Sequence, residues 1–372
     1  MFLGHSSDFL ADARKDTHAQ IKVDGMQERN GISAQAGNEP AQLSWKDDRR
    51  THLITRGNVD GIVSAALFYA RDPGLRVSFV TSTSAALDVV RRDIQSKEFF
   101  IVDLGITPEL VKNLQDKAKL GAKIHLLDHH QQTEAFALVQ NSGLDVHAYQ
   151  GASAASVALD YLKVNHGSER LAAIADIVEY CQSPYLAKAE AEYGWERLRE
   201  EARILDYSWR FMVDDDRFRQ VAARKLAEGL WPSEVGEIHR RYLQVVNEGR
   251  WERALEKVRS RLVVKDRVGV LRFGRYRTSL FGFGTRALAK VAEEEGCSVA
   301  VMINSRKKRS SLSLRGVGAE YAGKRPRLNL GEFVNQFTAE YGLSGGGHPS
   351  SAGAKIHTRD VPRLLQEVYC LV

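Results

Sequence analysis

The sequence predicts an α/β protein with a parallel, doubly wound sheet domain, a helical connector and a smaller α/β C-terminal domain. Short apolar runs alternate with helical segments between residues 51 and 205, a pattern typical of a parallel sheet covered by helices. Charged helix formers dominate residues 208–262, and strand patterns return from Arg267. A chain of 372 residues is long enough for two domains. We expect these domains over residues 46–207 and 263–372.

The composition indicates buried cores and favours a polyanionic partner. Hydrophobic residues make up 43% of the sequence and aromatic residues 8%, which is enough for packed interiors. The net charge is +6 and the isoelectric point is about 9.1, so an acidic partner such as nucleic acid is favoured. No apolar run is long enough to cross a bilayer, so we expect no membrane partner.

The N-terminal residues and the cysteines predict no chemistry. Residues 1–45 are polar and lack sustained periodicity, so we expect a poorly ordered leader with a short helix around Ser7 to Lys15. The first residues lack a basic start followed by an apolar stretch, so we expect no secretory signal. The three cysteines fit no zinc spacing and favour a reducing, cytoplasmic compartment. These cysteines are Cys181, Cys297 and Cys370.

The first domain is predicted from strands and helices that alternate along the chain. The predicted strands are His52–Thr55, Val77–Val80, Phe99–Val102 and Ile124–Leu127. The predicted helices are Ile62–Ala70, Ser84–Ser96, Pro108–Lys119, 151–163 and Glu169–Tyr180. Pro108 suits the first position of its helix, because the N–H that proline lacks has no partner there.

The connector and the C-terminal domain are predicted from a change in periodicity. An apolar stripe at near-helical spacing predicts helix packing rather than a ligand site. The stripe consists of Leu243, Val246, Trp251, Leu255 and Val258. Beyond it, alternating residues predict strands and a hairpin. The predicted elements are a strand at Val268–Phe273, a helix at Arg286–Glu295, a hairpin of Ser298–Ile303 with Ser311–Arg315, and a helix at Leu330–Tyr341.

Acids and histidines follow three of the predicted strands. Asp128, His129 and His130 end the strand that begins at Ile124, Asp103 ends the strand before it, and Asp60 lies shortly after the first strand. The carboxyl ends of parallel strands meet at a ligand crevice, where clustered carboxylates and imidazoles form a divalent-cation site. Oxygen-rich ligands with imidazole suit Mn²⁺, and Mg²⁺ next.

Two distant motifs resemble those of the DHH phosphoesterases, a family that includes RecJ-type exonucleases, oligoribonucleases and cyclic-dinucleotide phosphodiesterases. The first motif is Asp128-His129-His130. The second, Gly-Gly-Gly-His-Pro-Ser-Ser-Ala-Gly at residues 345–353, resembles the glycine-rich motif of the DHH-associated C-terminal domain. The resemblance covers roughly residues 50–372 and implies a metal-dependent phosphoesterase with a catalytic domain followed by a substrate-binding domain.

Four residues are the candidate ligands of one metal ion: Asp60, Asp103, His129 and Asp176. Asp176 is an unusual acid on an otherwise apolar helix, and Glu179 is a competing choice. The position of Asp176 resembles the family's fourth acidic motif, which favours it. The resemblance also implies that Asp103 matches the aspartate that usually bridges two metals in the family.

The sequence departs from the family pattern at the ligands of the second metal. The family usually takes a His and an Asp from a His-x-Asp-x-Asp-Gly type motif, and these positions are Arg56 and Asn58 here. Arginine cannot ligate a cation, and Asn58 offers only a neutral carbonyl oxygen. In a first hypothesis the chain is a one-metal enzyme in which the Arg56 guanidinium replaces the missing cation. In a second hypothesis catalysis is weak or lost while nucleotides or nucleic acid still bind.

His130 is the best candidate to contact the scissile phosphate, where it would stabilise charge or protonate the leaving oxygen. Asp128 would orient one of the two imidazoles. In related proteins an arginine that matches Arg315 contacts substrate phosphate. Arg315 ends a strand of alternating polar and apolar residues that includes Ser313.

The glycine run and a basic cluster complete the predicted substrate site. The N–H groups of Gly345, Gly346 and Gly347 would hold a phosphate, with His348 next to them. Residues 306–309 are all basic and would attract a nucleic-acid backbone if they face the cleft.

The leading prediction is a cytoplasmic, metal-dependent phosphodiesterase that acts on short or single-stranded nucleic acid with one Mn²⁺ or Mg²⁺ ion rather than two. The alternative enzyme acts on cyclic dinucleotides or small nucleotide phosphates. The alternative without activity is a catalytically degenerate nucleic-acid-binding protein. RNA or DNA as substrate, the polarity of cleavage and the oligomeric state stay open at this point.

Overall fold

The structure, a computed structural model, describes residues 51–130, 139, 142–148, 152–163, 167–273, 280–317, 328–341 and 343–372. The predicted leader, including the helix around Ser7 to Lys15, lies outside these residues. The residues Arg50–Val372 form one compact unit, which contains two sheets. The boundaries that we predict at residues 207 and 262 stay predictions.

The first sheet has five strands in the order β2-β1-β3-β4-β5, and every neighbouring pair is parallel. The strands are β1 (Thr51–Arg56), β2 (Arg76–Val80), β3 (Glu98–Val102), β4 (Lys123–Asp128) and β5 (Asp145–Ala148). The four predicted strands are confirmed. Strand β5 was not predicted, because this short edge strand carries polar residues at alternate positions and has no apolar run.

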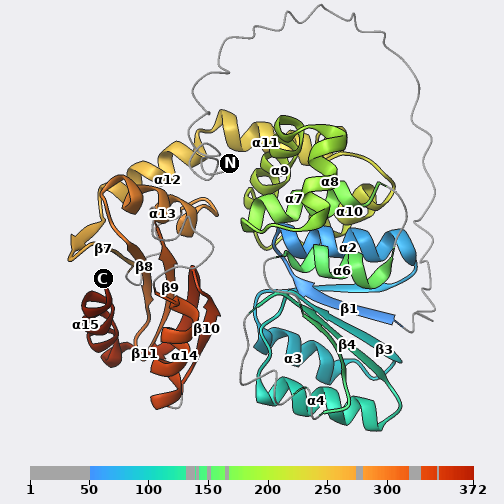
Figure 1. Cartoon of the computed structure of the whole chain (residues 1–372), viewed down its shortest axis with the longest axis horizontal. Helices are drawn as coiled ribbons and strands as arrows, with labels where there is room; N and C mark the ends of the chain where they lie inside the picture. Colours follow the sequence, from blue (N-terminus) through green and yellow to red (C-terminus); the bar gives the residue numbers. More distant parts are fainter. Residues whose placement is uncertain are drawn as a thin grey trace, which may run out of the picture. The chain divides into compact units, whose positions relative to one another are not determined.

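Helices cover both faces of this sheet (Figure 1). Helices α2 (Val59–Arg71) and α6 (Ala154–Leu162) lie on one face, and α3 (Thr83–Arg92) and α4 (Pro108–Lys119) lie on the other. Side chains of β1, β3 and β4 form one core with α3 and α4. The predicted parallel, doubly wound fold is therefore confirmed, and the carboxyl ends of β1, β3 and β4 meet at one edge.

A helical region connects the two sheets along the chain. Its elements are α7 (Glu169–Glu179), α8 (Pro184–Tyr193), α9 (Trp195–Arg210), α10 (Asp216–Ala227), η2 (Pro232–Glu234), α11 (Gly236–Asn247) and α12 (Arg250–Arg259). The predicted apolar stripe is wrong in its first half, because Leu243 and Val246 are 43% and 44% exposed. Gly249 breaks the helix with a φ of +57°, so the phase of α11 does not continue into α12, where Trp251 and Val258 are buried.

The second sheet has six strands in the order β10-β11-β9-β8-β7-β6. The strands are β6 (Val263–Lys265), β7 (Val268–Phe273), β8 (Val299–Ser305), β9 (Arg309–Gly316), β10 (Ser344–His348) and β11 (Ser351–His357). Only β7 and β8 pair in parallel, and the predicted hairpin is confirmed as the antiparallel pair β8–β9. The glycine run at residues 345–347 lies in the edge strand β10, which was not predicted.

Three helices accompany the second sheet: α13 (Gly284–Glu294), α14 (Leu330–Glu340) and α15 (Val361–Leu371), with the short η3 (Thr358–Asp360) before α15. Apolar residues of α14 and α15 form one core with β7, β8, β9 and β11. The predicted smaller α/β domain is therefore confirmed as a fold. In the described part of the chain, no helix has both the length and the apolar character needed to span a bilayer.

Candidate metal centre

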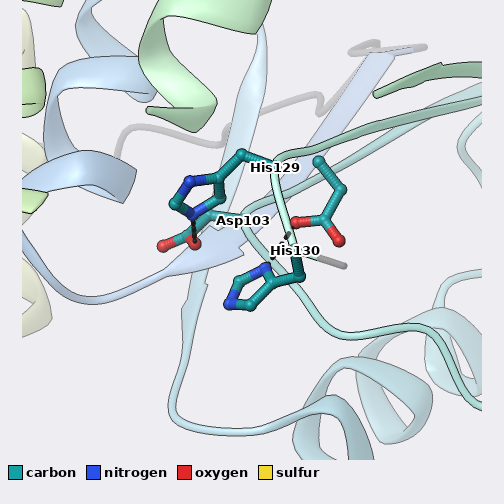
Figure 2. A group of neighbouring side chains, drawn as sticks. Asp103, His129 and His130 are labelled. Atoms are coloured by element: carbon teal, nitrogen blue, oxygen red, sulfur yellow. Dashed lines mark hydrogen bonds and ion pairs between the residues drawn. The ribbon is translucent and has the colours of Figure 1, made fainter. Parts of the chain in front are cut away.

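Acidic and imidazole side chains gather where β3 and β4 end (Figure 2). Asp103 follows β3, and Asp128, His129 and His130 end or follow β4. One ligand atom from each of these four residues lies within 4.8 Å of those of the other three. The predicted convergence of strand ends therefore places four groups of metal-ligand type together.

The His129 ring has one nitrogen in position to ligate a metal. Its Nδ1 lies 3.0 Å from the carbonyl oxygen of Ala152, and a carbonyl only accepts, so Nδ1 carries the hydrogen. Its Nε2 lies 3.3 Å from Asp103 Oδ1 and 3.7 Å from Asp60 Oδ2. In the neutral ring the Nε2 lone pair therefore faces two carboxylates, which is the arrangement of a histidine ligand oriented by a backbone carbonyl.

Asp103 has the features of a metal ligand. Its side chain is 1% exposed, and Oδ2 has no hydrogen-bond partner among the described residues. Its backbone φ is +56°, a left-handed conformation that costs energy in a non-glycine residue and concentrates at functional sites. A divalent cation between Asp103, Asp60 and His129 would satisfy this oxygen, so the residues present fit a metal ion.

The charges of this cluster are strongly coupled. Burial and the Asp103 charge hold the pKa of Asp60 well above its usual value. Burial also acts to raise the pKa of Asp103, but the hydrogen bond with His129 and the charge of Arg56 lower that pKa to about 2. Burial acts to lower the pKa of His129, yet its partners Asp103, Cys181 and Asp60 raise that pKa well above the ordinary value. Without a cation, a proton on His129 offsets part of the carboxylate charge.

Asp60 is held by the N-terminus of α6. The backbone N–H groups of Ala154 and Ala155 donate to Asp60 Oδ2 and Oδ1 at 2.9 and 2.7 Å. The unpaired N–H groups and the dipole at a helix N-terminus favour a carboxylate. These bonds fix Asp60 close to His129, and they leave lone pairs on both oxygens for a cation, since each carboxylate oxygen has two.

Asp176 lies near the same helix terminus, but its carboxylate is occupied. The N–H of Ser153 donates to it at 2.9 Å, and the hydroxyls of Ser156 and Ser183 donate at 2.9 and 2.5 Å. Burial raises its pKa despite these bonds. Glu179, the competing choice, is half-buried and acts electrostatically on Asp60. The role of either acid as a ligand stays a prediction.

The two positions that depart from the family pattern have different roles in the structure. The side-chain oxygen of Asn58 accepts from Gly61 N at 2.9 Å and caps α2, so this amide serves the helix. The Arg56 side chain is exposed, and its charge acts on Asp103. Gly57 lies between these two residues, and Arg219 of α10 fixes it by donating to its carbonyl at 3.0 Å.

His130 and Asp128 form a pair beside the metal candidates. His130 Nδ1 lies 2.7 Å from Asp128 Oδ1, so the carboxylate accepts from Nδ1 and sets the orientation of the ring. The rings of His129 and His130 meet nearly edge to face, with centroids 4.7 Å apart. The predicted orienting role of Asp128 is consistent with this geometry.

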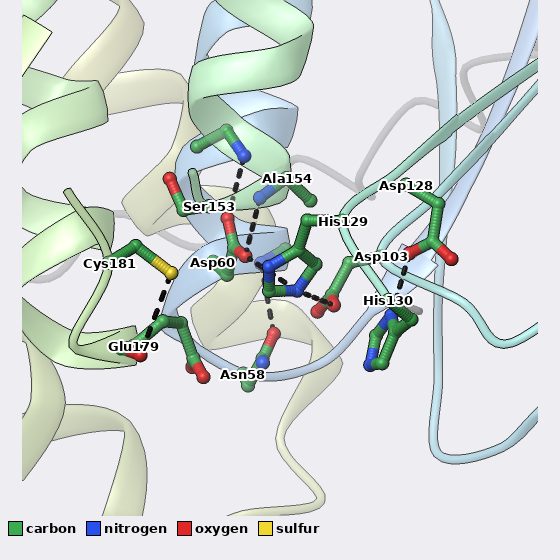
Figure 3. Close-up of polar contacts among 12 residues, drawn as sticks. Asn58, Asp60, Asp103, Asp128, His129, His130, Ser153, Ala154, Glu179 and Cys181 are labelled. Atoms are coloured by element: carbon green, nitrogen blue, oxygen red, sulfur yellow. Dashed lines mark hydrogen bonds and ion pairs between the residues drawn. The ribbon is translucent and has the colours of Figure 1, made fainter. Parts of the chain in front are cut away.

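The end of α7 contributes a contact to the site that the sequence did not predict, through Cys181 (Figure 3). Tyr180 has a φ of +58°, and this reversal brings Cys181 into hydrogen-bond contact with His129. The Cys181 thiol also lies 3.6 Å from the Glu179 carbonyl. No local sequence signal predicts this contact, because it depends on the left-handed residue that ends α7.

The C-terminal domain forms hydrogen bonds with the same end of α7. Arg286 of α13 donates to the Val178 carbonyl at 2.9 Å and pairs with Asp206 at 2.5 Å. Arg315 on β9 is half-buried, and burial lowers its pKa, with Glu179 and Arg56 among the charges that act on it. Two charges therefore act on both the predicted phosphate-binding arginine and the metal candidates: Glu179 also acts on Asp60, and Arg56 also acts on Asp103.

Packing requires the glycines of β10. A Cβ on Gly345 would lie 2.7 Å from Val334 of α14, and one on Gly347 would lie 2.2 Å from the Ser351 carbonyl oxygen. Gly346 and Gly347 also have φ values of +152° and +153°. Packing at Gly345 and Gly347 and the backbone conformation at Gly346 and Gly347 account for this run, and its binding of phosphate stays a prediction. The side chain of His348 lies outside the described residues.

A family model described as the DHHA1 domain matches residues 285–371. No curated protein matches the chain. The structure of a DHH domain from a member of the s1p family of ribosomal proteins is 16% identical, with a TM-score of 0.60 over 86% of this chain and 85% of that one. CDC45 from Entamoeba histolytica is 11% identical, with a TM-score of 0.50 over 88% and 96%.

A third solved structure, the pGpG-specific phosphodiesterase PggH from Vibrio cholerae, is 14% identical, with a TM-score of 0.48 over 86% of this chain and 98% of that one. The matched residues of the family model include the glycine-rich motif at residues 345–353, and the DHH-domain structure shares the fold. The chain therefore has a DHH-type fold and carries a DHHA1 domain at residues 285–371.

Proposed function

We propose that this chain is a metal-dependent phosphodiesterase that hydrolyses short or single-stranded nucleic acid in a reducing, cytoplasmic compartment. The observation that carries the proposal is the buried Asp103 oxygen that has no partner among the described residues, next to an imidazole nitrogen and a second carboxylate. A guanidinium acts on the same carboxylate. Cations and guanidinium groups are what a phosphate diester requires. The three scattered cysteines, which fit no zinc spacing, favour this compartment.

Asp60, Asp103 and His129 would hold one Mn²⁺ or Mg²⁺ ion. When bound, such an ion supplies hydroxide near neutral pH and offsets charge on the phosphate oxygens. His129 is prepared for this, because the Ala152 carbonyl holds the hydrogen on Nδ1. Asp176 would support the site through the N-terminus of α6, which it shares with Asp60.

Arg56 explains how one ion would suffice. Asn58 is committed to capping α2, so the second metal of the family lacks its usual ligands. The Arg56 guanidinium is permanently charged and binds phosphate through two parallel hydrogen bonds. It would hold a non-bridging oxygen of the substrate on the side where the family places its second cation.

His130 would serve the leaving group. Asp128 fixes the ring through Nδ1, so Nε2 is the atom that donates to the substrate when the ring is protonated. Donation of this proton to the departing oxygen lowers the barrier by general acid catalysis. Arg315 and Ser313, with the N–H groups of β10, would bind the rest of the substrate.

Activity of the full chain on short oligonucleotides with Mn²⁺ tests the proposal. We expect Asp103→Ala to abolish hydrolysis and His130→Ala to reduce turnover by about 100-fold, within the usual range for a general acid. Equal inertness of the wild type and both variants with Mn²⁺ and Mg²⁺ would refute the enzymatic function. The second candidate function would then hold: a nucleic-acid-binding protein without catalysis, which the departures at Arg56 and Asn58 favour.

A further inference from the structure

The last turn of α7 receives a hydrogen bond from the C-terminal domain. The last four carbonyls of a helix have no partner within it. Here the Asp176 carbonyl accepts from the N–H groups of Tyr180 and Cys181. The Val178 carbonyl accepts from Arg286 of α13 at 2.9 Å. A guanidinium also suits the negative end of the helix dipole, so Arg286 caps α7 from a distant part of the chain.

Asp206 of α9 fixes the guanidinium that forms this cap. Asp206 is 0% exposed, and its Oδ2 lies 2.5 Å from one terminal nitrogen of Arg286. Arg210 holds the same carboxylate with two bonds, at 3.0 and 2.9 Å. Burial acts to raise the pKa of Asp206, but the charges of Arg210 and Arg286 lower it. Since the nitrogens of a guanidinium form a rigid fork, the bond to Asp206 directs the other terminal nitrogen of Arg286 to Val178.

Packing at the start of α13 sets the position of Arg286. Phe283, the residue before α13, is 0% exposed. Its ring meets those of Tyr207 and Trp251 nearly edge to face, with centroids 4.9 and 5.4 Å apart. These aromatic contacts join the first turn of α13 to α9 and α12, so Arg286 reaches α7 from a firmly packed helix.

The last turn of α7 is in contact with groups that hold two candidate metal ligands (Figure 3). Cys181 forms a hydrogen-bond contact with His129. The Asp176 carboxylate accepts from the N–H of Ser153 at 2.9 Å, and the next two N–H groups along the chain hold Asp60. A displacement of this turn would therefore move both His129 and Asp60.

We propose that Arg286 is a positioning residue for the metal centre, which holds Asp60 and His129 within reach of one cation by capping α7. The proposal rests on the proposed function, since Asp60 and His129 are metal ligands only there. The Asp60 and His129 atoms that face each other are 3.7 Å apart, so a small shift of either changes the site. Docking of the C-terminal domain on α7 then becomes a requirement for tight metal binding. By linkage, a bound cation strengthens this docking in turn.

The Mn²⁺ affinity of the full chain, measured by isothermal titration calorimetry, tests the role of Arg286. Arg286→Gln removes the cap and leaves Asp206 paired with Arg210. We expect it to weaken Mn²⁺ binding by about tenfold, the low end of the range for groups that orient a ligand.

Arg210→Gln is the matched control. Arg210 also pairs with Asp206 and donates to a backbone carbonyl, but that carbonyl belongs to Gly282, at 2.5 Å, and not to α7. We expect this variant to lose a similar amount of melting temperature and to keep its Mn²⁺ affinity within about twofold. Equal Mn²⁺ affinities in Arg286→Gln and Arg210→Gln would overturn the proposal.

Hydrogen exchange reports the cap without any cation. In EDTA, the N–H groups of Tyr180 and Cys181 should exchange at least about tenfold faster in Arg286→Gln than in the wild type, because their bonds to the Asp176 carbonyl need an intact last turn. Arg210→Gln should match the wild type. Mass spectrometry of a peptide that ends at Cys181 measures the difference, and wild-type exchange in Arg286→Gln would refute the cap.

A third variant, Arg286→Lys, separates the cap from the charge. Lysine keeps a positive charge beside Asp206 but has one nitrogen in place of the fork. We expect it to restore the melting temperature and to leave exchange as fast as in Arg286→Gln. Wild-type exchange and Mn²⁺ affinity in Arg286→Lys would mean that charge alone matters, which contradicts the cap. A wild type that binds no Mn²⁺ would refute the proposed function, whereas unchanged exchange and affinity in Arg286→Gln would refute only the positioning role.

Discussion

Strands β3 and β4 carry an acid and a histidine at both of their ends, and the two pairs differ in what they leave unsatisfied. At the carboxyl ends, Asp103 and His129 meet below the protein surface. Toward the amino ends, Glu98 and His125 meet at 3.1 Å. The residue types are the same, so composition alone would assign both groups to metal binding.

The pair toward the amino ends is satisfied by its neighbours. His125 uses Nε2 for Glu98 and Nδ1 for Asp145 at 2.7 Å, and the Tyr161 hydroxyl also reaches Nδ1 at 3.0 Å. His147 bonds the other oxygen of Asp145 at 3.0 Å. We name these residues the distal cluster. Both ring nitrogens of His125 are in hydrogen bonds, and among the described residues this cluster leaves no buried carboxylate oxygen without a partner.

The pair at the carboxyl ends is buried and incompletely satisfied. Asp103 Oδ2 has no partner in the described part of the chain, and two carboxylates face one nitrogen of His129. An orphaned buried carboxylate oxygen is costly unless a cation or water completes it. The two clusters contain the same residue types but differ in hydrogen bonding. A buried carboxylate oxygen that lacks a partner, rather than the presence of His and Asp, therefore distinguishes a metal centre from a structural polar cluster.

The largest expected effect comes from removing the orphaned carboxylate. We expect Asp103→Asn to weaken Mn²⁺ binding by at least about 100-fold, since changes to groups that only support a ligand already cost ten- to a hundredfold. Asp145→Asn, the matched change in the distal cluster, should leave Mn²⁺ affinity unchanged. Isothermal titration calorimetry of both variants, with melting temperatures as a folding control, measures the contrast.

Comparable losses in the two variants would break the distinction between the clusters. Equal Mn²⁺ affinity in the wild type and Asp103→Asn would place the ion elsewhere in the chain. The group of Asp103, Asp128, His129 and His130 would then be a buried polar network.

Much of the fold follows from the sequence, because buried parallel strands are apolar runs between helices. Strands β1 to β4 are confirmed on that basis. Strands β10 and β11 escaped prediction because β10 consists mainly of glycine and has no side-chain period. The backbone pairing of Gly346 with Gly353 defines it instead, and a pattern of side chains does not report such pairing.

The convergence of Asp60, Asp103 and His129 was also predictable, since topology brings the ends of parallel strands to one edge. The direction of each carboxylate was not. Asp176 is saturated by hydroxyls from two other segments, through Ser156 and Ser183. These contacts join residues that are separated in sequence, so no local sequence pattern predicts them.

The next largest expected effect is the pH dependence of Mn²⁺ affinity. In the metal-free protein the pKa values of His129 and Asp60 are both raised, so protons compete with the cation for the same lone pairs. Mn²⁺ binding should therefore release protons and strengthen as pH rises, by about tenfold per pH unit for each proton released. The effect levels off above the raised pKa of His129, where the ring is already neutral.

Calorimetry in buffers of different ionisation enthalpy counts these protons. We expect at least one per ion at neutral pH in the wild type and in Asp145→Asn. Binding that releases no proton between pH 6 and pH 8 would contradict a His129 ligand.

The smallest expected effect is the change in the free energy of unfolding when the distal cluster loses the charge of Asp145. Asp145 is 46% exposed where it pairs with His125, so Asp145→Asn should lower the free energy of unfolding by no more than about 1 kcal/mol. Its pKa is lowered, because the hydrogen bond with His125 outweighs the effect of its partial burial. The carboxylate therefore stabilises the fold above the ordinary pKa of aspartate, and this contribution is lost as pH falls through the lowered value. Urea unfolding of the wild type and the variant across that pH range measures this effect. We expect the difference in their free energies of unfolding to shrink as the pH falls. A difference that persists at low pH would mean that Asp145 acts through packing and not through charge.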